Sequence, residues 1–206
     1  MHLHSLTKWK RWVLKTYGFK PGEGLYTDMN AIRRDEMTDN IHSILCGSVG
    51  LGTDHRSGRA QRGDPAGYGG EDILHPAQTK GFVCAHYPHI RPELSEKIAF
   101  VTTQELEDCY PELSPKEREY KAVREHGAVF LMGIGGALKS GNIHDGRAPD
   151  YDDWSLNGDI LLYDSLLDIS LEVSSMGIRV NPEALRRQLA IRGCEEWQSC
   201  PSRRRC

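Results

Sequence analysis

The 206-residue sequence predicts a single domain of the α+β class, built on a mixed sheet. Two observations support this fold class. The composition, with 38% hydrophobic and 27% charged residues, is typical of a globular chain that buries a core. Segments with strand character outnumber helical segments and do not alternate strictly with them, whereas a doubly wound parallel sheet requires that alternation.

The first 44 residues predict a helix followed by a strand. Apolar side chains recur at helical spacing from Ser5 to Tyr17, and Gly18 and Pro21 end this pattern. Residues 24–34 then alternate as a strand does. One face of that strand comprises Leu25, Thr27, Met29 and Ala31.

Residues 45–81 predict no regular structure. They contain nine of the 21 glycines and show neither a strand nor a helix period. Such a segment buries too little apolar area to offset its conformational entropy, so we expect a disordered linker or insert.

From about Phe82 onward the sequence again predicts regular secondary structure. The sequence Ser114-Pro-Lys-Glu117 is a capping box, which predicts a helix to about Glu125 that Gly127 ends. The continuous apolar run 128–134 predicts a central strand.

Three further elements complete the prediction. Residues 159–163 and 169–174 have strand character. A last helix is capped by Asn181, runs through Ile191 and stops at Gly193.

Charge and hydropathy limit the classes of partner. The net charge of −3 argues against a chain built to bind nucleic acid, because phosphate neutralisation needs surplus Lys and Arg. No apolar run approaches membrane-helix length, and the start lacks the apolar core of a secretion signal, so we expect a cytoplasmic protein. None of the six cysteines forms a C-x-x-C pair, which favours scattered reduced thiols over a metal site.

Acidic residues crowd the segment 144–159, with Arg147 among them. Carboxylates held this close repel one another unless cations compensate. Such an oxygen-rich cluster suits Mg²⁺ together with substrate phosphates, and it equally suits a solvated acidic loop.

Other polar motifs are less specific. Gly133-Ile-Gly-Gly136 lacks the lysine and serine of a P-loop, so a plain turn is favoured over a phosphate cradle. Arg33 lies at a strand end, where a guanidinium could bind a phosphate at two points, although most such arginines face solvent. His4, His42 and His144 each favour a structural role over a catalytic one. Spacing alone indicates no more than a candidate Mg²⁺-nucleotide enzyme.

Five phrases nevertheless resemble, in their order and spacing, those of A-type asparagine synthetases, the ammonia-dependent aspartate–ammonia ligases. The resemblance covers residues 3–44 and about 82–196. The phrases are His4-Ser-Leu-Thr-Lys-Trp-Lys-Arg11, Gly22–Met29 with Ala31–Glu36, Gly127–Gly136, Arg147–Trp154, and Asn157–Leu161 through Ser174–Val180.

The resemblance implies a fold and a reaction. The fold is the antiparallel-sheet catalytic core of class II aminoacyl-tRNA synthetases, here incomplete. The reaction consumes L-aspartate, ammonia and ATP with Mg²⁺: the β-carboxylate attacks the α-phosphate, pyrophosphate leaves, and ammonia displaces AMP from β-aspartyl-AMP. The family forms homodimers and binds neither nucleic acid nor membrane.

The resemblance also implies site residues. Lys10 and Arg33 are expected to contact the activated carboxylate and the α-phosphate. Asp152, Ser175 and Arg179 are expected to bind aspartate or ATP. The positions suited to Mg²⁺ and ATP are Asp159 and Glu172.

Departures from the family pattern lead to further expectations. The chain is expected to be a single partial catalytic domain over 1–206, without the family's dimerisation segment and final ATP-binding arginine. Inserting one base ahead of codons for the family's Tyr-Val-Asp-Gln-Trp-Asp-Trp-Glu yields Leu-Cys-Gly-Ser-Val-Gly-Leu-Gly, the sequence of residues 45–52. We therefore hypothesise a frameshift over about 45–81, and a non-native tail over 197–206. The alternatives are a catalytically dead fragment that binds nucleotide or a partner subunit, and an aspartyl- or asparaginyl-tRNA synthetase-like paralogue.

Overall fold

The computed structural model describes residues 6–33, 37–53, 80–89, 94–95 and 97–194. The chain divides into two compact units, Met1–Ala60 and Gln61–Cys206.

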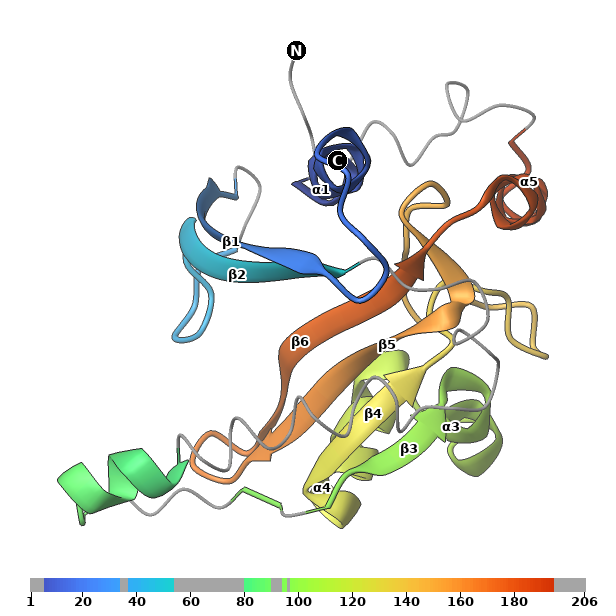
Figure 1. Cartoon of the computed structure of the whole chain (residues 1–206). Helices are drawn as coiled ribbons and strands as arrows, with labels where there is room; N and C mark the ends of the chain where they lie inside the picture. Colours follow the sequence, from blue (N-terminus) through green and yellow to red (C-terminus); the bar gives the residue numbers. More distant parts are fainter. Residues whose placement is uncertain (1–5, 34–36, 54–79, 90–93, 96, 195–206) are drawn as a thin grey trace. The chain divides into compact units, whose positions relative to one another are not determined.

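The first unit contains a helix and a two-stranded ribbon (Figure 1). Helix α1 spans Leu6–Thr16, and strand β1 spans Gly24–Ile32. Along β1, exposed side chains alternate with partly buried ones, and the partly buried face is the one that the sequence predicted. Both elements are therefore confirmed.

The structure differs from the sequence prediction at β2, which spans Leu45–Thr53 and pairs antiparallel with β1 from Ile32↔Leu45 to Gly24↔Thr53. These residues were expected to lack regular structure because of their glycines. Here the glycines make room for a side chain: a Cβ at Gly50 would collide with Lys10 Nζ, and one at Gly52 would lie 3.3 Å from Lys10 Cδ. Residues 54–79 of the predicted insert lie outside the described residues, so the prediction for that stretch stays a prediction.

The second unit is built on a four-stranded sheet with the order β3-β4-β5-β6 (Figure 1). Strand β3 (Ala99–Thr102) pairs parallel with β4 (Ala128–Met132). The pairs of β4 with β5 (Asp152–Asp164) and of β5 with β6 (Ile169–Arg179) are antiparallel. Strand β4 is buried between two neighbours, as its continuous apolar sequence predicted.

Helices α3 and α4 pack against the sheet around one core. Helix α4 (Pro115–His126) has the predicted capping box at Ser114 and ends at Gly127. Helix α3 (Thr103–Cys109) was not predicted, although Thr102 and Glu105 form a capping box of the same kind. The core cluster comprises Leu106, Ala122, Val123, Val129, Leu131, Ile134 and Leu161.

Helix α5 (Pro182–Ile191) follows β6 and is capped as predicted by Asn181, whose side chain accepts hydrogen bonds from the Glu183 and Ala184 amides. Parallel and antiparallel strand pairs in one sheet, with helices between them, confirm the α+β class. Within the described residues, no helix has the length and apolar character needed to cross a bilayer.

Candidate functional site

Polar side chains gather where β5 pairs with β6. The register sets Asp152 opposite Arg179 and Asp159 opposite Ser175. A tight antiparallel pair thus brings together residues that lie far apart in the sequence, and Glu172 lies earlier on the same strand as Ser175. All five residues that sequence analysis assigned to this half of the chain lie on these two strands.

Arg147 joins two of these residues and was not among the predicted site residues. Its Nη1 donates to Ser175 Oγ at 2.8 Å, and its Nη2 forms an ion pair with Asp159 Oδ1. Burial disfavours the cation, but the negative charges of Asp159 and Asp152 outweigh it and raise the pKa of Arg147. The acidic segment therefore carries its own compensating cation.

Asp152 is the most buried ionisable group of the site, with 0% of its surface exposed. Neither carboxylate oxygen has a well-formed hydrogen bond among the described residues, although a contact with the Asn157 side chain lowers the pKa of this carboxyl. Gly177 leaves the space that this carboxylate occupies, since a Cβ there would lie 2.7 Å from Asp152 Oδ2. Burial raises the pKa of Asp152 to about 6, although the charges of Arg147 and Arg179 act in the opposite direction.

Arg179 supplies the matching donor. Its guanidinium carbon lies 4.3 Å from the centre of the Tyr151 ring, and its Nη2 donates to the Gly177 carbonyl at 3.1 Å. Its Nη1 is buried and has no partner within the described part of the chain. A buried carboxylate and a buried N–H without well-formed partners are each costly, and a polar ligand that reached them with a donor and an anionic group would offset that cost.

Asp159 and Glu172 form the acidic side of the site. Burial, and then the charge of Asp159, raise the pKa of Glu172. Repulsion of this kind is relieved by a cation. Among the described residues no group of three or more His, Cys, Asp or Glu side chains is arranged to hold a metal ion, so two carboxylates would need further oxygens from a ligand.

A buried pair lies between α4 and the loop that precedes β5. His144 Nε2 lies 3.0 Å from Glu119 Oε1, and Lys116 Nζ lies 3.0 Å from Glu119 Oε2. Burial raises the pKa of Glu119, but the hydrogen bonds and charges of His144 and Lys116 outweigh it, so the pKa lies below its usual value. This geometry is consistent with the structural role expected of His144.

The glycine-rich segment after β4 is a turn, as the sequence favoured. Gly135 has a φ of 106°, and a Cβ there would lie 2.8 Å from two atoms of the Trp154 indole. The glycine is therefore required for packing against Trp154.

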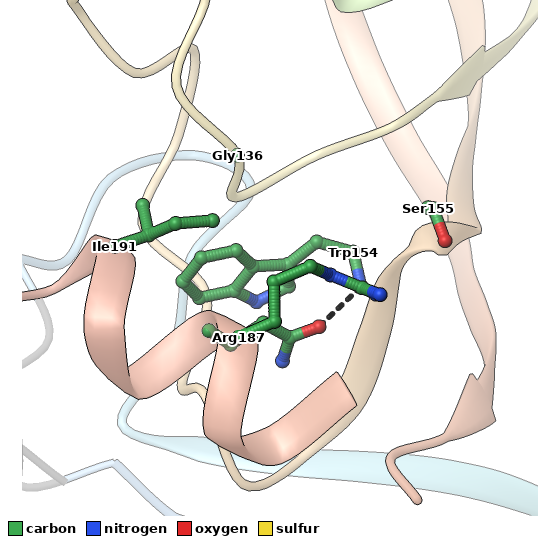
Figure 2. A pocket seen from close by; sticks show the side chains of 6 residues that line it. Gly136, Trp154, Ser155, Arg187 and Ile191 are labelled. Carbon is green, nitrogen blue, oxygen red and sulfur yellow. Dashed lines mark hydrogen bonds between the residues drawn. The ribbon is translucent and has the colours of Figure 1, made fainter. Parts of the chain in front are cut away.

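A small pocket opens beside Trp154 (Figure 2). Arg187 at its edge pairs with Asp153 at 3.0 Å, and sequence analysis predicted none of these lining residues for the site. The pocket is lined by Gly136, Trp154, Ser155, Arg187, Gln188 and Ile191.

Lys10 and Arg33 belong to the first unit. Lys10 is buried at 8% exposure beside the glycines of β2. Arg33 directly follows β1, its backbone N–H donates to the Ile44 carbonyl at 2.8 Å, and its side chain is exposed. The roles expected of both residues stay predictions.

Comparison with known proteins gives one consistent family. A family model described as "Aspartate-ammonia ligase" matches residues 1–49 and 72–205. Proteins named aspartate–ammonia ligase are similar to this chain: that of Ruminiclostridium cellulolyticum is 52% identical over 94% of the chain, and that of Clostridium perfringens 51% over 97%. The protein of that name from Fusobacterium nucleatum is 48% identical over 97% of the chain. The chain spans 58%, 59% and 61% of these relatives' lengths.

Proposed function

Because this chain belongs to the aspartate–ammonia ligase family, we propose that its site serves the ATP-dependent amidation of L-aspartate with ammonia to L-asparagine, through β-aspartyl-AMP. The observation that supports this most strongly is the buried Asp152 carboxylate opposite the partly buried Arg179, whose Nη1 has no partner among the described residues. A zwitterionic amino acid offers an ammonium to the carboxylate and a carboxylate to the guanidinium.

The proposed chemistry follows from the poor reactivity of a carboxylate as an acyl donor. Adenylation converts the β-carboxylate into a mixed anhydride with a good leaving group, and ammonia then attacks its carbonyl carbon and releases AMP. In this proposal the chain contributes alignment and charge. Asp152 holds the substrate ammonium, and Arg179 and Arg147 supply positive charge beside the groups that become more anionic.

We propose that Asp159 and Glu172 hold Mg²⁺ with phosphate oxygens of ATP. The charge of Asp159 raises the cost of ionising Glu172, and a divalent cation that needs only one or two protein ligands would relieve it. When bound, Mg²⁺ would neutralise charge on the phosphates. Arg147 then positions Asp159 and Ser175 through its two contacts.

The remaining features of the proposal rest on the family. They are a class II aminoacyl-tRNA synthetase-like core, a cytoplasmic location, a homodimer, and contact of Lys10 and Arg33 with the activated carboxylate and the α-phosphate. We propose neither a nucleic acid nor a membrane as a partner. The net charge of −3 argues against binding to nucleic acid, because phosphate neutralisation needs surplus Lys and Arg.

AMP release tests the proposal directly. The purified chain is incubated with ATP, Mg²⁺, L-aspartate and ammonia beside a full-length family member, with each component omitted in turn. Aspartate labelled with ¹⁸O in its β-carboxylate should transfer one label to AMP, because ammonia breaks the bond between carbonyl carbon and bridging oxygen. Formation of ADP and phosphate would contradict the adenylate.

Two substitutions test whether AMP formation depends on the site residues. Arg147→Met should lower AMP formation at least about tenfold, since it removes the charge that joins Asp159 to Ser175. Lys121→Met, at an exposed cation on α4, is the matched control and should leave the rate unchanged. Nucleotide binding by a folded chain that never forms AMP would instead support the non-catalytic fragment.

A further inference from the structure

Gln188 on α5 is one of the least exposed polar residues of the second unit, at 1% exposure. Its side chain makes three hydrogen bonds, all to the backbone of one short segment. Its Oε1 accepts from the Trp154 amide at 2.9 Å, the bond drawn as a dashed line to Trp154 in Figure 2. Its Nε2 donates to the Pro149 carbonyl at 2.9 Å and to the Asp152 carbonyl at 3.0 Å.

These three bonds bracket Asp152. One holds the carbonyl of Asp152 itself, one holds the backbone two residues later, and one holds the backbone three residues earlier. The set needs two N–H donors and one acceptor at the end of a single side chain, and among neutral side chains only an amide supplies them. The Asp152 side chain has no well-formed hydrogen bond among the described residues. The way its backbone is held therefore helps to set the direction of the carboxylate.

Helix α5 is itself fixed relative to β5. Arg187 pairs with Asp153 at 3.0 Å, and Arg192 lies over the Trp154 ring with 5.3 Å between its guanidinium carbon and the ring centre. The Arg192 Nη2 also donates to the Arg147 carbonyl at 3.3 Å. The helix therefore contacts the start of β5 on both sides of Gln188.

We infer that Gln188 is a positioning residue of the site, which holds the backbone of residues 149–154 so that the Asp152 carboxylate stays buried against Gly177 and beside Arg179. The ligand named for Asp152, the ammonium of L-aspartate, rests on the proposed function; the positioning itself rests on the hydrogen bonds. A glutamine that served only to fill the core would affect stability without affecting the environment of Asp152.

The test compares three variants of the full chain. Gln188→Leu and Gln188→Met both remove the two hydrogen bonds to carbonyls and the amide oxygen that accepts from Trp154, at similar volume and without adding charge. Leu189→Ala is the matched control, because it weakens the packing of the same helix at the neighbouring buried position, where Leu189 clusters with Leu185 and Cys194. All are measured well below their unfolding temperatures, and Gln188→Met decides if Gln188→Leu does not fold.

The first readout is the titration of the Asp152 carboxyl, followed by carbon NMR with aspartate-labelled protein. Both Gln188 variants should move its midpoint down from about 6 toward the ordinary value by at least about one pH unit, since a loosened segment admits water. Leu189→Ala should leave it in place. An unmoved midpoint in a folded Gln188 variant would overturn the inference.

The second readout is binding of L-aspartate in the presence and absence of Mg²⁺-ATP. The Gln188 variants should bind L-aspartate about tenfold more weakly while their affinity for Mg²⁺-ATP changes less than about threefold. An equal loss for Leu189→Ala would overturn the inference, because it would trace the effect to helix packing. If the unaltered chain binds no L-aspartate, the proposed function fails at this site, and the titration still decides whether Gln188 positions Asp152.

Discussion

Replacing Asp152 with asparagine should stabilise the folded protein at neutral pH. In the folded state burial raises the pKa of this carboxyl from 3.8 to about 6. At 1.36 kcal/mol per pKa unit, this difference corresponds to about 3 kcal/mol by which folding disfavours the ionised form. An amide has the shape of the carboxyl and avoids that cost.

The pH dependence follows from the direction of the shift. Between about pH 3.8 and 6 the folded state binds more protons at Asp152 than the unfolded state, so the contribution of Asp152 to stability falls as pH rises through this window. The gain from Asp152→Asn should therefore be near zero at pH 4 and reach as much as about 3 kcal/mol at pH 7.

Urea unfolding followed by circular dichroism at half-unit pH steps measures this difference. Glu107→Gln is a control of opposite sign, because a hydrogen bond from Ser140 lowers the pKa of Glu107 despite burial. That variant should be less stable than the unaltered chain at pH 7, with the difference shrinking as pH falls. A gain for Asp152→Asn that is the same at pH 4 and 7, or a loss at pH 7, would refute the reasoning.

Three further predictions concern local geometry. Gly177→Ala places a methyl group 2.7 Å from Asp152 Oδ2 and should lower the free energy of unfolding by about 1–3 kcal/mol. Part of this loss should vanish in an Asp152→Ala background, which removes the carboxylate but leaves the contacts at 3.0 Å with the Asn157 and residue-152 Cβ atoms; full additivity in the double-mutant cycle would contradict the contact with Oδ2. Gly135→Ala combines a positive φ with a Cβ 2.8 Å from the Trp154 indole, and it should lower the free energy of unfolding measured in urea by about 2–4 kcal/mol. A decrease of less than about 1 kcal/mol would contradict this, because it would mean that the turn can move away from Trp154. Ser114→Ala removes the N-cap of α4 and should cost about 1 kcal/mol, with Ser114→Thr as the variant expected to retain most of the stability.

Local signals in the sequence predicted the elements whose ends they mark. The box at Ser114, the cap at Asn181 and the alternation along β1 depend on neighbours a few residues away, and all three appear in the structure. Helix α3 carried an equally local signal at Thr102 that the sequence analysis overlooked. The prediction for β2 was wrong for a different reason. The glycines of this strand leave space for the Lys10 side chain, which is distant in sequence.

The residues of the site divide in the same way. Their chemical types, and through the family phrases their identities, could be predicted from the order of residues alone, and so could the crowding of carboxylates around Arg147. Only the tertiary structure decided their environment. Asp152 is buried without a well-formed hydrogen bond among the described residues, and Arg147 contacts both β5 and β6. Gln188, on the later helix α5, holds the backbone of residues 149–154. Burial and charge compensation depend on which distant segments pack together, and strand pairing and helix docking determine that packing.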